Sequence, residues 1–122
     1  MMKDKMIYIV ITPDLTKEKW ITFCNRWDNQ SNISLDTSLI NSREAIEYIA
    51  GIAFINKGRD LSLSVMANLA EKKLTPETLL EMIFDIGDQA CKEAVCLRDD
   101  LSDDLKNKCI STELIHGHCR RK

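Results

Sequence analysis

The fold is decided by the stretch SREAIEYIAGIAFINKG, which spans residues 42–58. From Tyr48 to Ile55 it carries no charged or strongly polar side chain. At a helical rise of about 1.5 Å per residue this run is too short to cross a bilayer, so it belongs inside a small globular domain. Ser42 fits a helix N-cap and Gly58 fits a helix stop. The stretch therefore predicts a central helix with no solvent-facing side, which the rest of the chain must cover.

Two further helices are expected, one on either side of the central one. Before it, Thr16 fits an N-cap, and the helix that follows is expected to end near Asp28. The apolar stripe of this first helix consists of Trp20, Phe23, Cys24 and Trp27. After the central helix, Asp60 fits the cap of a third helix. It is expected to end at Lys72-Lys73, where two cations suit the helix dipole.

The second half of the chain begins with the clearest helix start. Thr75 fits an N-cap and Pro76 the first helical position. Apolar residues then recur at spacings of three and four: Leu79, Ile83, Ile86, Ala90, Ala94 and Leu97. This spacing predicts a fourth helix with one continuous buried stripe, ending near Asp99. Ser102 fits the cap of a fifth helix that runs from Asp103 to about residue 115.

One strand is expected near the start of the chain. Residues 6–11, MIYIVI, are dense in β-branched and aromatic side chains and end at a Thr-Pro turn. Residues 33–35 or the alternating residues 61–65 are candidate partners for this strand. The third alternative is an extended arm that packs on the helices.

These elements predict a mainly α fold, a compact bundle of about five helices around the buried helix 42–57. With 122 residues, 44% hydrophobic and 30% charged, the chain fits one soluble domain over 1–122, with a flexible tail at 116–122. Consecutive helix pairs also resemble part of an α-solenoid, but no recurring period supports that alternative. Gly51 and Gly87 lie inside predicted helices, and we interpret them as points where the second and fourth helices approach closely.

The bulk composition points to a soluble protein of the cytoplasm. A net charge of −2 gives no support for nucleic-acid binding, and the N-terminal apolar run is too short for a signal-peptide core or a membrane span. The five cysteines are an odd number in a chain without an export signal, which argues against a disulfide framework. Cys109, His116, His118 and Cys119 match no common zinc-ligand spacing, so no metal or cofactor is expected.

An excess of acidic residues marks the segment from Glu77 to Asp104. It holds nine acids against two bases, a net charge of −7. On one long helix several of these acids would form a row opposite the apolar stripe. The predicted partner-binding residues are Glu77, Glu81, Asp85, Asp88, Asp99, Asp100, Asp103 and Asp104. Such a row is either a solvated helix face or a docking face for a basic protein.

Three classes of function remain open on these residues. The leading hypothesis is a small cytoplasmic inhibitor, the immunity protein of a bacterial toxin, which would neutralise a basic toxin domain such as a nuclease through the acidic face. The alternative is a helical adaptor, chaperone or regulatory subunit that binds its partner through an apolar groove. A small enzyme or metal protein is the third class, but no catalytic set accompanies the cysteines or the histidines. We therefore expect a binding protein and not an enzyme.

Overall fold

The computed structural model describes residues 6–28 and 32–111 of the chain. Its elements in chain order are β1 (Ile7–Val10), α1 (Lys17–Trp27), β2 (Ile33–Asp36), α2 (Arg43–Ile55), α3 (Asp60–Ala70), α4 (Glu77–Ile86), α5 (Gln89–Cys96) and α6 (Asp103–Ser111). The predicted mainly helical fold is therefore confirmed, and so is the N-terminal strand, which pairs with a second strand. The described residues form six helices where about five were expected. The tail at 116–122 and the last turn of the predicted fifth helix lie outside the described residues.

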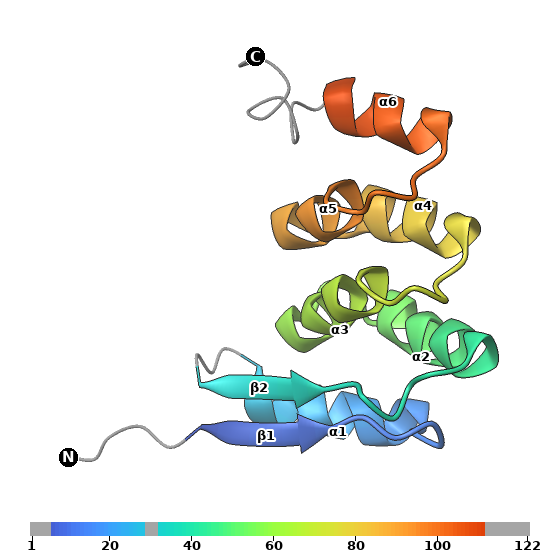
Figure 1. Cartoon of the computed structure of the whole chain (residues 1–122). Helices are drawn as coiled ribbons and strands as arrows, with labels where there is room; N and C mark the ends of the chain where they lie inside the picture. The colour runs from blue at the N-terminus through green and yellow to red at the C-terminus, as the bar shows by residue number, and fades with distance from the viewer. Residues whose placement is uncertain (1–5, 29–31, 112–122) are drawn as a thin grey trace.

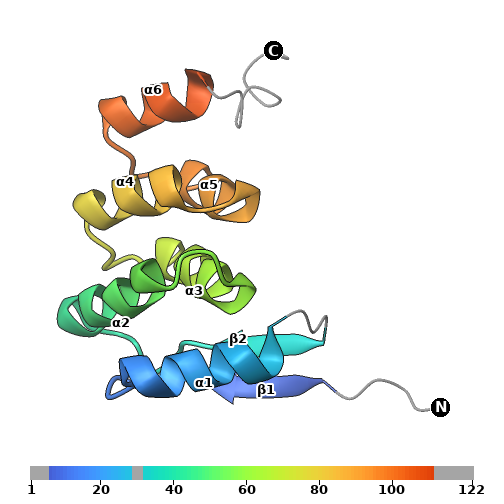
Figure 2. The ribbon, with the colours of Figure 1, turned by 180° about the vertical axis from the view of Figure 1, so that it is seen from behind.

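The elements stack in layers along one direction (Figures 1 and 2). The two strands with α1 form the first layer, the pair α2 and α3 the second, the pair α4 and α5 the third, and α6 the fourth. Helices of 8 to 13 residues are barely stable alone in water, so each layer depends on burying its apolar side chains against the next.

The strands form a two-stranded parallel sheet with Ile7 opposite Ile33 and Ile9 opposite Leu35. Of the candidate partners for residues 6–11, the segment at 33–35 is therefore the right one. The connection between the parallel strands contains α1, which covers one face of the sheet (Figures 1 and 2). Ile9 is buried in the core.

A buried hydrogen bond connects the first layer to the second. The indole Nε1 of Trp20 donates to Ser62 Oγ at 2.8 Å, and Trp20 is 1% exposed. The hydroxyl of Thr16 accepts from the backbone N–H of Lys19 and so caps α1 as expected. The predicted apolar stripe of α1 is confirmed, because Trp20 and Cys24 are buried and the remaining two residues pack against the core.

Helix α2 contributes to the core on one side only. Ile46, Ile49 and Ile52 are buried with its small residues Ala50 and Ala53. On the opposite side Tyr48 is 47% and Ile55 62% exposed. The expectation that this helix has no solvent-facing side is therefore wrong, because the stacked layers cover α2 mainly from the side of α3 (Figure 1).

The predicted continuous fourth helix is broken into α4 and α5. Helix α4 ends at Ile86, and the Asp88 carboxylate caps α5 by accepting from Cys91 N–H at 3.1 Å. The chain changes direction between α4 and α5, but each helix buries apolar side chains at spacings of three and four residues. The sequence pattern therefore resembles that of one continuous helix. As a result Leu97, expected on the stripe, is 72% exposed. Thr75 is not the cap of α4, because Pro76 holds the N-cap position and no side chain caps this helix. The buried Thr75 hydroxyl donates instead to the carbonyl of Leu69.

The two glycines differ in what surrounds them. No atom lies within 4 Å of the place where a Gly51 side chain would begin, whereas a Cβ at Gly87 would lie 2.3 Å from the Cβ of Cys91. The predicted close approach is therefore wrong at Gly51. At Gly87 it is local, between the end of α4 and the first turn of α5, where only glycine fits.

We expect Gly51→Ala to stabilise the protein by up to about 1 kcal/mol, because alanine favours an exposed helix position over glycine. Gly87→Ala, the matched control, is expected to destabilise it, since the added methyl overlaps Cys91. Urea denaturation of both variants measures the two free energies of unfolding. A destabilised Gly51→Ala variant would contradict the open surroundings at that position.

The fourth layer is attached to the third by a covalent bond. Cys96 at the end of α5 and Cys109 in α6 form a disulfide, with Cα atoms 5.7 Å apart. The cysteine count argued against a disulfide framework, but one disulfide forms, because the turn between α5 and α6 brings together two cysteines that are 13 residues apart. Disulfides persist mainly in oxidising compartments, so this bond does not support the cytoplasmic expectation, which stays a prediction.

Reduction of this disulfide is expected to lower the free energy of unfolding by about 3 kcal/mol, the loop-closure value for a loop of this length. Urea denaturation with and without dithiothreitol measures the effect. The double variant Cys96→Ala/Cys109→Ala is the control, since its stability must not respond to the reductant. Equal stability of the wild type in both conditions would mean that the bond contributes nothing.

Candidate functional site

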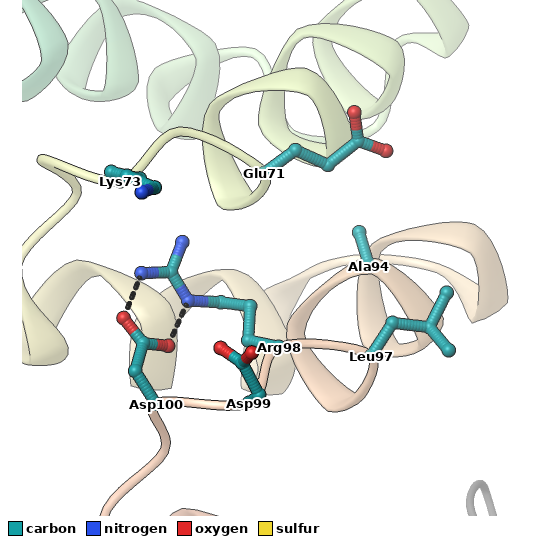
Figure 3. Close-up of a pocket in the computed structure, with 7 residues that line it drawn as sticks. All are labelled: Glu71, Lys73, Ala94, Leu97, Arg98, Asp99 and Asp100. Carbon is teal, nitrogen blue, oxygen red and sulfur yellow. Dashed lines mark hydrogen bonds and ion pairs between the residues drawn. The ribbon is translucent and has the colours of Figure 1, made fainter.

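A cleft of about 540 Å³ opens between the C-terminal end of α3 and the C-terminal end of α5 (Figure 3). Its lining residues are Glu71, Lys73, Ala94, Leu97, Arg98, Asp99 and Asp100. The cleft therefore combines carboxylates, two cations and an exposed leucine at the seam between the second and third layers.

Arg98 forms one wall of the cleft and is the residue that joins these two layers. Its Nη1 donates to the carbonyls of Ala70 and Lys72, both at 2.7 Å. Ala70 is the last residue of α3, and Lys72 lies in the turn just after it. The last carbonyls of a helix have no partner within the helix, and a cation near them also suits the helix dipole. The side chain is only 9% exposed, so the guanidinium belongs to the structure and not to the open surface.

The same guanidinium holds Asp100 with two parallel hydrogen bonds (Figure 3), from Nε at 2.9 Å and from Nη2 at 2.7 Å. Hydrogen bonding to Arg98 lowers the pKa of Asp100 below its ordinary value of 3.8. Asp100 itself remains 56% exposed. Its carboxylate is thus fixed in position while one side still faces solvent.

Four carboxylates gather around the turn between α5 and α6, and we call them the acidic corner: Asp99, Asp100, Asp103 and Asp104. All four are exposed. The one basic residue of the segment 97–104, Arg98, has its charge directed inward. All four residues of the acidic corner are thus exposed, but Arg98 balances the charge of Asp100, so Asp99, Asp103 and Asp104 carry the net negative charge of the corner.

The rest of the predicted acidic row lies at the seam between α4 and α6. At one end of this seam Ser102 donates a hydrogen bond to Glu77, and at the other Lys108 forms an ion pair of 2.7 Å with Asp85. Helix α6 therefore lies along the row and connects to both of its ends. Glu81 stands between these two contacts and is half-buried.

Asp88 leaves the row altogether because it caps α5. Lys92, the base that interrupts the row in the sequence, donates to the carbonyls of Phe84 at 2.6 Å and Gly87 at 3.1 Å. It thus satisfies the last carbonyls of α4, as Arg98 does for α3. The structure consequently brings four of the eight predicted residues together at the acidic corner and places the other four on or beside α4.

A second, more apolar groove lies beside α2. It has a volume of about 500 Å³ and is lined by Thr16, Lys17, Glu18, Glu47, Tyr48, Gly51, Ile52 and Ile55. The Tyr48 hydroxyl donates to the carbonyl of Leu15 at 2.6 Å and so fixes the ring at this surface. This groove joins the start of α1 to the uncovered side of α2.

The two other cysteines of the described residues lie in the core, where a thiol is poorly reactive. Cys24 and Cys91 are buried free thiols. Burial raises the pKa of Cys91 to about 12, and its Sγ donates to the carbonyl of Leu63 at 3.2 Å. Thiols of this kind are unreactive because the thiolate is the nucleophile. Within residues 6–28 and 32–111 no three Cys, His, Asp or Glu side chains are grouped so that they could hold a metal ion.

Of the four cysteines and histidines near the end of the chain that match no common zinc-ligand spacing, residues 116, 118 and 119 lie outside the described part of the chain. None of the helices in that part is long and apolar enough to cross a bilayer.

Comparisons of the chain with protein-family models, with curated proteins and with solved structures found no match.

Sequence reasoning missed both the cleft and the role of Arg98. From the sequence, a single arginine among acidic residues suggests only that it partly neutralises an acidic surface. The signal that could have found it is its position: it directly follows the last turn of α5, while α3 ends without a capping glycine. An arginine side chain is long enough to reach the carbonyls of a neighbouring helix.

The Arg98–Asp100 pair is expected to make stability depend on acid pH. A carboxylate whose pKa is lowered in the folded state stabilises that state above its unfolded pKa, and the contribution is lost as the pH falls through the folded pKa. We therefore expect Asp100→Asn to be less stable than the wild type at neutral pH. The difference in free energy of unfolding should shrink below about pH 3.8.

Urea denaturation at neutral pH and at about pH 3 gives these differences. Asp99→Asn is the matched control, because it neutralises the neighbouring exposed carboxylate and leaves the pair intact. A pH-independent difference for Asp100→Asn would show that the ion pair does not contribute to stability.

Proposed function

We propose that this chain is a small binding protein that blocks a basic protein partner, most concretely as the bacterial immunity protein of a toxin domain. The supporting observation is the acidic corner, where four exposed carboxylates surround a turn whose one arginine points inward. We place this action in the cytoplasm and assign the chain no catalytic activity of its own.

The cleft next to the corner fits one kind of side chain well. Leu97 is 72% exposed and offers an apolar surface for the methylene stem of a lysine or arginine. Asp99 and Glu71 lie on the same cleft and can pair with the charged end (Figure 3). Lys73 also lines the cleft, so the basic side chain would enter from the side of Asp99.

The corner would act by charge complementarity with a basic surface such as the substrate cleft of a nuclease. Complementary charge accelerates encounter and disfavours wrong partners. Arg98 joins the second and third layers and holds the carboxylate of Asp100, so this residue of the corner needs little reorganisation when a partner binds. Preorganised charge of this kind suits an inhibitor that must act quickly.

To test this, a partner captured from the native host is titrated against the chain and its affinity is measured. We expect the triple variant Asp99→Asn/Asp103→Asn/Asp104→Asn to lose at least about tenfold in affinity, since charged contacts each contribute on the order of 1 kcal/mol or more. Loss of inhibition of the partner's activity should follow the loss of affinity.

The matched control is Asp14→Asn/Glu44→Gln/Asp60→Asn, which changes the net charge by the same amount at exposed positions that line neither the cleft nor the groove beside α2. It should bind like the wild type. If both triple variants bind alike, or if binding does not weaken between about 50 and 500 mM salt, the partner does not use the acidic corner.

The second candidate function is that of a helical adaptor, chaperone or regulatory subunit that binds an apolar segment. The observation that favours it is the groove beside α2, where Ile55 is 62% exposed next to Tyr48. Binding there would be insensitive to salt and would be abolished by Ile55→Lys. The two candidate functions are therefore distinguished by the variant that loses affinity for the partner: the triple variant of the acidic corner for the first, and Ile55→Lys for the second.

A further inference from the structure

The disulfide that joins α5 to α6 closes a loop that contains the whole acidic corner. Two of the four carboxylates precede α6, and Arg98 holds that of Asp100 in place with two hydrogen bonds. The other two, Asp103 and Asp104, are the first residues of α6. The positions of Asp103 and Asp104 relative to Asp100 therefore depend on where α6 lies.

Helix α6 buries little besides the bonded cysteine. It is the last layer that the structure describes (Figure 1), and of its nine residues Leu105 and Cys109 are buried. The hydrogen bond to Glu77 and the ion pair to Asp85, which connect this layer to α4, both lie at the surface. Exposed contacts of this kind contribute little to stability, and a helix this short does not persist alone in water.

The disulfide is therefore a large part of what keeps α6 on α5. Closing a loop of this length disfavours the states in which α6 has left α5 by a factor of about one hundred. The layers below α6 keep contacts of their own, among them those of Arg98 with the carbonyls of Ala70 and Lys72. Reduction is thus expected to release α6 locally while the other three layers stay folded.

We propose that the Cys96–Cys109 disulfide is a redox switch for the acidic corner, an inference that rests on the proposed function of that corner. In the cytoplasm, where that function is placed, a disulfide is usually transient and often redox-sensing. The corner binds its basic partner more tightly when the bond is formed than when it is reduced.

The reductant is a dithiol. Its first thiolate attacks one sulfur of the bond and forms a mixed disulfide, which its second thiol then resolves. Two electrons and two protons pass to the protein, so the products are the thiols of Cys96 and Cys109 and the cyclic disulfide of the reductant. Both cysteines are buried, so the attack takes place when α6 opens transiently.

Reduction acts on the corner by separating its charges. Arg98 balances the charge of Asp100, so the net negative charge lies on the other three carboxylates. When α6 is released, Asp103 and Asp104 move with it, and only Asp99 stays beside the fixed pair. A basic partner then meets one fixed net charge in place of three, and it must order α6 again to recover the others, which lowers its affinity.

The first test needs no partner and measures amide hydrogen exchange of the full chain, oxidised and after treatment with dithiothreitol. The N–H of Lys106 donates to the carbonyl of Ser102 at 2.9 Å, in the first turn of α6. Its exchange should accelerate by about one hundredfold on reduction. In the reduced chain its protection should remain at least about tenfold lower than that of Leu69, which is buried in α3. Exchange in Cys96→Ala/Cys109→Ala, the control, must not respond to the reductant.

The second test measures the affinity of both redox forms for a hexalysine peptide, a basic probe of defined charge, at about 50 mM salt. Reduction should weaken binding to the wild type by at least about threefold. The affinity of Asp103→Asn/Asp104→Asn should not respond to reduction, because the charges that move with α6 are then absent. Asp99→Asn is the matched control, since it lowers the affinity and keeps the response to reduction.

Equal exchange of Lys106 in both redox forms would overturn the switch, and so would reduced Leu69 that exchanges as fast as Lys106. An affinity for hexalysine that reduction leaves unchanged would overturn it as well. The proposed function survives these outcomes if Asp103→Asn/Asp104→Asn still binds hexalysine more weakly than the wild type in the oxidised form. If that variant binds like the wild type, both the proposed function and the switch are wrong, even where the exchange of Lys106 shows that α6 moves.

Discussion

The structure depends on the burial of α3 between its neighbours. The helices of this chain are too short to persist alone, so each layer is stable only against the next. Specific contacts cross each seam, among them Trp20 with Ser62 between the first two layers, Arg98 with the end of α3 at the next, and the Cys96–Cys109 disulfide at the last. Apolar burial supplies the driving force, and contacts of this kind set how the layers align.

Much of the charge in the second half of the chain acts within the fold. Asp85 and Glu77 connect α4 to α6, Asp88 caps a helix, and two cations satisfy the ends of α3 and α4. The four residues of the acidic corner, by contrast, all stay exposed at the turn after α5. Residues whose charge stabilises the fold therefore lie close in sequence to residues whose charge stays exposed. Amino-acid composition alone cannot distinguish the two groups.

The sequence revealed those features that depend on neighbouring residues. Caps at Thr16, Ser42 and Ser102 are local patterns, and each has its expected bond to a backbone N–H. The caps expected at Asp60 and Thr75 are wrong, because α3 and α4 begin without a side-chain cap. The features that were missed depend on distant contacts or on space. The break at Gly87 is required by a side chain in the next helix, and the exposed side of α2 results from the direction in which the layers stack. Periodicity reports which face is apolar, but not whether another element covers it.

The disulfide has a practical consequence for the end of the described chain. Ser111, the last residue of α6, follows Cys109 by two positions, and Cys109 is bonded to the end of α5. A fluorophore or fused domain attached just after this point would start from a place that is covalently fixed relative to the third layer. Distances measured from such a label would report on the body of the molecule and not on a swinging helix.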